Sequence, residues 1–126
     1  MNYKFLIPKA LALIDLPTGR SKHFRFLLKR RKIVGFGYNR SYDTHPIAYK
    51  YGYLFSGIHS ELDCILSFNH APRELHRCTM VNLRFLADGT LSMSKPCKKC
   101  QELLRNFNID KIVYTNRLGE FVDATF

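Results

Sequence analysis

The chain has 126 residues, of which 20 are Lys or Arg and 10 are Asp or Glu, so its formal charge at neutral pH is +10. This length corresponds to one domain and excludes an enzyme built from a dinucleotide-binding domain plus a substrate domain. The hydrophobic share of 46% excludes a disordered chain. The charge predicts an anionic partner, such as a nucleotide, a nucleic acid or an anionic membrane surface. Most of the excess lies in residues 1–58, which carry 11 basic and 2 acidic residues.

The apolar stretch at residues 5–14 is interrupted by Pro8 and Lys9. A membrane span needs about 20 apolar residues, so we expect no membrane partner. The short, interrupted stretch also argues against a signal peptide. We therefore expect a cytoplasmic protein whose four cysteines are reduced thiols or metal ligands.

Hydrophobic periodicity predicts the elements in chain order. A helix at residues 4–15 comes first, with Pro8 indicating a late start or a kink. A hairpin follows, with strands at 23–28 and 33–38 around the basic turn 29–32. Residues 40–57 form a long loop rich in Tyr and Gly, and loops of this length are usually functional. Next come a helix at 58–68, a strand at 78–85, a helix at 96–107 that Pro96 opens, and strands at 111–115 and 120–124.

This element order predicts an α/β protein with three layers, in which a five-stranded mixed sheet has helices on both faces. The connection at residues 116–119 is too short for a helical crossover. We therefore expect the last two strands to run antiparallel. Nothing in the sequence divides residues 1–126, so we expect a single domain.

Two short motifs carry the chemistry. The first is His59-Ser60-Glu61 at the start of the second helix, and the second is Cys97 and Cys100 at the start of the third. Cysteines at positions i and i+3 of a helix start lie on one face and can bind a single ion. One imidazole and two thiolates leave the fourth position of a tetrahedral Zn²⁺ open, as in catalytic sites. Glu61 lies close enough to move a proton without binding the metal.

A structural site made of all four cysteines is the alternative. Cys64 lies inside a predicted helix among core residues, and neither Cys64 nor Cys78 has another cysteine close by. We interpret both as buried apolar residues.

At these motifs the sequence resembles the zinc-dependent cytidine and deoxycytidylate deaminase superfamily, whose signature is H-x-E followed by P-C-x-x-C. It looks closest to small single-domain deaminases encoded by bacteriophages, through residues 37–39, 44–46, 51–52, 59–63 and 93–97. The resemblance implies a cytidine-deaminase-like fold with one Zn²⁺ per chain, bound by His59, Cys97 and Cys100. It also implies attack of zinc hydroxide on C4 of cytosine, with Glu61 as the proton shuttle.

The resemblance implies substrate-binding roles for further residues. The backbone N–H of Ser60 would face the base carbonyl, Asn39 would bind a sugar hydroxyl, and Tyr114 would contact the base or the sugar. Turn formation is an equal alternative for Asn39. His45 would contact substrate or order its loop, and Lys95 would place a positive charge near the substrate. The Tyr-rich loop can stack bases or pack on itself.

This sequence departs from the family at four positions. Lys95 stands where hydroxyl or acidic residues are frequent in relatives. Ser60 stands where the family usually has Ala, and Phe24 and Arg25 stand in a strand where small residues are common. The last two put the shape of the pocket behind the site in question.

Three functions are possible, two of them enzymatic with different substrates. The first is deamination of a free cytosine nucleotide such as dCMP, and the second is deamination of cytosine in single-stranded DNA or RNA; adenine is a further possible base. The third is a non-catalytic module that binds nucleic acid, against which the intact Glu61 argues. The turn at residues 29–32 lies about 23 Å along the strand from Asn39, too far to bind a mononucleotide. Cations expected nearer the site are Arg20, Lys22, Arg25, Arg40, Lys50, Lys95, Lys98 and Lys99.

The family resemblance also implies a homo-oligomer, because relatives commonly assemble through helices beside the site. If a phage encodes the chain, its location is the host cytoplasm.

Overall fold

The computed structural model describes residues 2–16, 18, 22–40, 50, 59–68 and 70–124. Its elements are α1 (Leu6–Leu11), β1 (Lys22–Lys29), β2 (Lys32–Tyr38), α3 (Ser60–Leu66), the 3-10 helix η1 (Pro72–Arg77), β3 (Thr79–Phe85), α4 (Lys98–Asn106), β4 (Lys111–Thr115) and β5 (Phe121–Ala124). Every predicted helix and strand is present, whereas η1 was not predicted. The predicted loop at residues 40–57 lies almost wholly outside the described residues.

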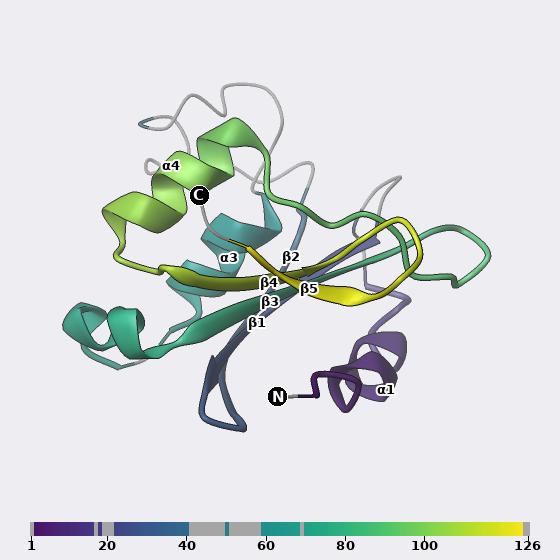
Figure 1. Ribbon diagram of the computed structural model, residues 1–126, viewed down its shortest axis with the longest axis horizontal. Coiled ribbons are helices and arrows are strands. Elements are labelled where there is room, and N and C mark those ends of the chain that lie inside the picture. Colours follow the sequence, from purple (N-terminus) through teal and green to yellow (C-terminus); the bar gives the residue numbers. More distant parts are fainter. Residues whose placement is uncertain are drawn as a thin grey trace.

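The strands form one sheet in the order β2-β1-β3-β4-β5 (Figure 1). β1 pairs antiparallel with both β2 and β3, and β3 pairs parallel with β4. The chain passes through α4 between these two parallel strands, as a crossover connection requires. β4 and β5 are antiparallel, which confirms the prediction from their short connection.

Helices cover both faces of the sheet, with α3 and α4 on one side and α1 on the other (Figure 1). Each face has its own apolar core. The first core joins residues of α3 and α4 to the sheet and includes Leu27, Met80 and Ile112. The second joins α1 to the opposite face and includes Phe24 and Val81. The predicted three-layer α/β architecture is therefore confirmed.

The close approach of α3 to the sheet depends on Gly37 in β2. A Cβ atom added at Gly37 would lie 2.2 Å from the backbone nitrogen of Cys64 and 2.5 Å from the backbone oxygen of Ser60. Only glycine permits two backbones to pass this closely. Gly37 thereby sets the height of α3, and of the residues at its start, above the sheet.

The three predicted helices are each shorter in the structure than the hydrophobic pattern predicts. α1 covers six residues, and Pro8 falls in its first turn, where a missing N–H is tolerated. The third predicted helix begins later than expected, because Cys97 is the N-cap of α4 and Pro96 precedes the cap. Among the described residues, no helix is long and apolar enough to cross a membrane.

Candidate active site

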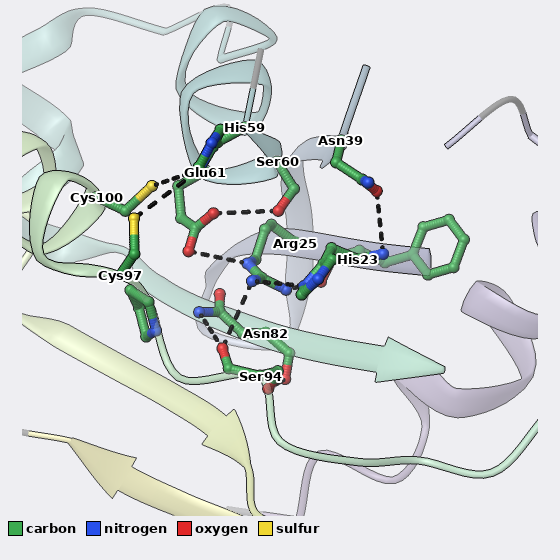
Figure 2. Close-up of polar contacts among 12 residues, drawn as sticks. His23, Arg25, Asn39, His59, Ser60, Glu61, Asn82, Ser94, Cys97 and Cys100 are labelled. Carbon is green, nitrogen blue, oxygen red and sulfur yellow. Dashed lines mark hydrogen bonds and ion pairs between the residues drawn. The ribbon is translucent and has the colours of Figure 1, made fainter. Parts of the chain in front are cut away.

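His59, Cys97 and Cys100 come together where α3 and α4 begin (Figure 2). The Nδ1 atom of His59 lies 3.6 Å from the Sγ atom of Cys100 and 3.9 Å from that of Cys97. The three potential ligand atoms all lie within 4.8 Å of one another. The structure thus brings the predicted ligands together, although His59 and Cys100 are 41 positions apart in the sequence.

Two of the three ligands are helix caps, which explains how the sequence builds the cluster locally. His59 is the N-cap of α3, and Cys97 is the N-cap of α4. The backbone oxygen of Cys97 accepts a hydrogen bond from the N–H of Gln101 at 2.8 Å, which forms the first turn of α4. That turn brings Cys100 to the same side as Cys97.

The cluster fits a zinc ion. With Zn–S bonds of about 2.3 Å and Zn–N bonds of about 2.0 Å, tetrahedral ligation separates sulfur from nitrogen by about 3.5 Å. The separations of 3.6 and 3.9 Å agree with this value. The neighbouring Cys100 and the His59 ring lower the pKa of Cys97 to about 4, so its thiolate is available at neutral pH.

The segment before Cys97 is held by Ser94, which is 1% exposed. Its Oγ donates to the backbone oxygen of Asn82 at 2.9 Å and accepts from the backbone N–H of Thr115 at 2.7 Å. Its own N–H donates to the backbone oxygen of Thr115 at 2.8 Å. Ser94 therefore holds the metal-binding segment against the middle of β3 and the end of β4, a role the sequence analysis missed.

Glu61 lies beside the zinc ligands in the first turn of α3 and is 3% exposed (Figure 2). Its Oε1 accepts a hydrogen bond from Ser60 Oγ at 3.1 Å, and its Oε2 lies 3.3 Å from Arg25 Nε in an ion pair. Burial alone would raise the pKa of Glu61, but the charge of Arg25, the Glu61 backbone N–H, His23 and Ser60 bring it below its usual value. The carboxylate is thus ionised at neutral pH.

Arg25 corrects one prediction from the sequence. It was counted among the cations available to substrate at the sheet edge, but it is 3% exposed and faces Glu61 (Figure 2). It shares the sheet face of Leu27, which packs in the core beneath α3 and α4. The signal was present in the alternation of β1, which places residues 23, 25 and 27 on that face.

His23 also borders the site. Its Nδ1 lies 3.3 Å from Arg25 Nη2. Burial and the positive charge of Arg25 lower the pKa of His23 to about 3. The ring is therefore neutral at physiological pH, and Nδ1 accepts a hydrogen bond from the guanidinium.

The predicted substrate-binding residues lie around this cluster to different degrees. Ser60 is buried at the start of α3, and Lys95 is exposed two residues before Cys97. Tyr114 is half-buried and shares the sheet face of Ile112, which packs beneath α3 and α4. His45 lies outside the described residues.

Both polar atoms of the Asn39 side-chain amide form hydrogen bonds with backbone groups. Its Oδ1 accepts from the N–H of His23 at 3.1 Å, and its Nδ2 donates to the carbonyl of Thr18 at 2.6 Å. These contacts tie the end of β2 to the start of β1 and to the segment after α1. They are of the structural kind that the sequence analysis gave as the alternative to sugar binding.

Several predicted site cations also have internal partners. Lys22 Nζ donates to the carbonyl of Ile14 at 2.7 Å, and Arg40 forms an ion pair with Asp63. Lys50, Lys95, Lys98 and Lys99 are exposed, and Arg20 lies outside the described residues.

The basic turn at residues 29–32 lies at the far end of the β1–β2 hairpin from the site (Figure 1). Lys29 pairs with Glu74 at 3.8 Å, and the Arg31 guanidinium lies 4.9 Å from the centre of the Phe5 ring. The turn thus packs against η1 and the region around α1, remote from the metal ligands.

The two remaining cysteines are core residues, as predicted. Cys64 and Cys78 are both fully buried in the core beneath α3 and α4. Burial raises the pKa of each thiol, most strongly for Cys64. Neither belongs to the metal-ligand cluster found among the described residues, so a site of four cysteines is ruled out.

A His/Cys/Cys triad beside a buried carboxylate, on a three-layer α/β fold, defines a zinc-dependent hydrolase of the deaminase class. Residues 25–116 match the cytidine and deoxycytidylate deaminase zinc-binding region. This match covers most of the chain, and the chain therefore belongs to that family. Its zinc-binding residues are His59, Cys97 and Cys100.

The fold is similar to that of a solved structure, a cytidine deaminase from Burkholderia pseudomallei. The TM-score is 0.61 at 14% sequence identity, and the similarity covers 99% of this chain and 93% of that chain. At this identity the similarity concerns the fold, and it confirms the predicted cytidine-deaminase-like architecture. A search of curated proteins found no significant match.

Proposed function

We propose that this protein deaminates cytosine to uracil in a free cytosine nucleotide, such as dCMP, with Glu61 as the proton shuttle. The observation that carries the proposal is the buried carboxylate of Glu61, paired with Arg25, beside the His/Cys/Cys triad. Family membership implies a cytosine-containing substrate. A non-catalytic module would have no use for this carboxylate.

Zinc, when bound to the triad, lowers the pKa of a water molecule to near neutrality. Glu61 then supplies the proton transfers that hydrolysis requires. Its carboxylate accepts one proton from the nucleophilic water and passes it to N3 of the base, then accepts the second proton of that water, from the hydroxyl now on C4, and passes it to the departing amine, which leaves as ammonia. Water and cytosine are thereby converted to uracil and ammonia, and Glu61 ends in its starting state.

The surrounding residues would orient the nucleotide. The backbone N–H of Ser60 would face the base carbonyl, and Tyr114 would contact the base or sugar from the sheet. Lys95 is exposed beside the ligand segment and would contact the phosphate. For Asn39, the contacts with Thr18 and His23 favour a supporting role over direct sugar binding.

The contacts of the basic residues support a mononucleotide over a nucleic acid strand. Lys22, Arg25 and Arg40 would have extended the cationic surface, but each has an internal partner. Lys50, Lys95, Lys98 and Lys99 are exposed, and one phosphate needs only one or two of these cations. Single-stranded DNA or RNA is the second candidate, favoured by the net charge of +10.

The test is to incubate the zinc-loaded protein with dCMP, dCTP, deoxycytidine, AMP and single-stranded oligonucleotides, and to measure deaminated product by chromatography. We expect a free cytosine nucleotide to be converted to the corresponding uracil nucleotide. Uracil from oligonucleotide alone would refute the nucleotide proposal, and turnover of AMP alone would refute cytosine. Salt-sensitive oligonucleotide binding without turnover would indicate a non-catalytic module.

The proton shuttle is tested with Glu61→Gln, which keeps the shape of the side chain. We expect turnover to be abolished while zinc stays near one per chain. Loss of zinc would show that Glu61 binds the metal and is misassigned. Glu102→Gln is the matched control, because Glu102 is an exposed acid of α4 and its replacement should leave turnover unchanged.

We also propose that residues 1–126 act as one domain and form a homo-oligomer. The resemblance to phage-encoded deaminases supports a phage origin, in which case the protein would act in the host cytoplasm.

A further inference from the structure

Two of the residues that depart from the family, Arg25 and Ser60, contact the same carboxylate. Arg25 contributes an ion pair to Oε2 of Glu61, and Ser60 donates a hydrogen bond to Oε1. We propose that Arg25 is a positioning residue which, together with Ser60, fixes the Glu61 carboxylate in the orientation needed for proton transfer. This inference rests on the proposed function of Glu61.

The guanidinium of Arg25 is itself held rigidly. Its Nη1 donates to the backbone carbonyls of Phe24 and Leu83, each at 3.1 Å. Its Nη2 contacts Nδ1 of His23 at 3.3 Å and donates to the carbonyl of Ser94 at 3.5 Å. The planar, many-donor fork of arginine suits this set of acceptors, whereas a lysine ammonium could satisfy only part of it. Arg25 is therefore a fixed point attached to β1, β3 and the metal-binding segment.

The contacts to Glu61 leave capacity for chemistry. The two carboxylate oxygens have four lone pairs, and their neighbours among the described residues are Ser60 at Oε1, Arg25 at Oε2 and the Glu61 backbone N–H. One lone pair remains, which can serve first the water and then the base. Held at both oxygens, the carboxylate cannot rotate freely about its terminal torsion, which is otherwise broad.

Charge pairing alone does not explain the arrangement. A buried ion pair is often no more stabilising than well-packed apolar residues of similar volume. The cost of burying Arg25 is better accounted for if the guanidinium orients the group that moves protons. A misplacement of about 1 Å at a reacting group can cost about 100-fold in rate, so the orientation of Glu61 has large kinetic consequences.

The experiment measures kcat and KM separately for Arg25→Met, Arg25→Lys and Ser60→Ala on the cytosine nucleotide that the unmodified protein converts. For Arg25→Met we expect kcat to fall about 10- to 100-fold, with KM changed less than about threefold and zinc near one per chain. Arg25→Lys should recover part of the loss, because it keeps the charge. Ser60→Ala should lose less than Arg25→Met, because it removes a neutral donor.

The matched control is Arg84→Met. Arg84 lies on the same face of the sheet, directly opposite His23 in the β1–β3 pairing, and its Nη1 donates to the carbonyl of Met93 at 3.4 Å. The substitution Arg84→Met removes one arginine charge from this face. Among the described interactions, no hydrogen bond or ion pair joins Arg84 to Glu61, so kcat should change less than about threefold. If Arg25→Met does not fold, Arg25→Lys and Ser60→Ala decide the question, since neither leaves Glu61 without a nearby cation.

An unchanged or increased kcat in folded Arg25→Met would overturn the proposal. If Arg25→Met does not fold, an unchanged or increased kcat in both Arg25→Lys and Ser60→Ala would overturn it. An increase would mean that the ion pair withholds Glu61 from substrate. If the unmodified protein converts no cytosine nucleotide, the proposed function fails, and crystal structures of the unmodified protein and Arg25→Lys then test the positioning itself. A displaced Glu61 carboxylate would support positioning, and an unmoved one would refute it.

Discussion

Ser94 gives the sharpest prediction about how the fold supports the metal ligands. Replacing Ser94 by Ala removes its Oγ atom and with it two hydrogen bonds. The Oγ atom accepts from the backbone N–H of Thr115 at 2.7 Å and donates to the backbone oxygen of Asn82 at 2.9 Å. Thr115 is fully buried, so its N–H would be left without a partner and away from water. An unsatisfied buried donor costs about 1–3 kcal/mol. We expect Ser94→Ala to reduce the free energy of unfolding by this amount.

The same substitution should weaken zinc binding, because Ser94 fastens the segment that ends at Cys97. Loss of groups that hold metal ligands in place typically reduces affinity by about 10- to 100-fold, and we expect a decrease of about 10-fold. Urea denaturation of the apo and zinc-loaded proteins measures the first effect. Competition with a chromogenic chelator measures the second.

Ser92→Ala is the control for Ser94→Ala. Within the described part of the chain, Ser92 takes part through its backbone, as its N–H donates to Arg84 and its carbonyl accepts from Thr115 Oγ1. Alanine preserves both contacts. Equal stability and equal zinc affinity in the two variants would refute the role assigned to the Ser94 hydroxyl.

Two further predictions concern the sheet beneath α3. Gly37→Ala should lower the free energy of unfolding by about 3 kcal/mol or more in urea denaturation, because the new Cβ meets backbone atoms of α3. Gly35→Ala, whose Cβ would meet side chains at 3.1–3.2 Å, should cost far less, and equal losses would contradict the argument. For His23, the folded-state pKa of about 3 lies below the ordinary value of 6.5, so the unfolded state takes up the proton first and stability falls as the pH decreases from 6.5 towards 3. Through His23, the free energy of unfolding of the unmodified protein should fall by about 3 kcal/mol between pH 7 and pH 4. In denaturation experiments at both pH values, the fall for His23→Gln should be smaller by about this amount. Equal falls in the two proteins would refute the buried, neutral ring.

Local patterns in the sequence were sufficient for the elements and for the metal ligands. Helical and alternating periodicities depend only on neighbours along the chain, and they located α1, α3, α4 and the five strands of the sheet. The His59 and Cys97 motifs are equally local, because each ligand caps the helix that carries it. The 3-10 helix η1 was missed because its six residues lack a comparable apolar periodicity.

Tertiary structure alone decided what surrounds Glu61. The placement of β1 between β2 and β3 puts Arg25 opposite Asn82 and beneath α3, so a residue counted as a surface cation became the buried partner of the carboxylate. The strand order that creates this contact is not encoded in any short segment. The same holds for Ser94, whose hydrogen bonds reach two strands distant in the sequence. Sequence motifs thus determined which atoms bind zinc, and packing across the sheet determined which groups hold the proton-transferring carboxylate.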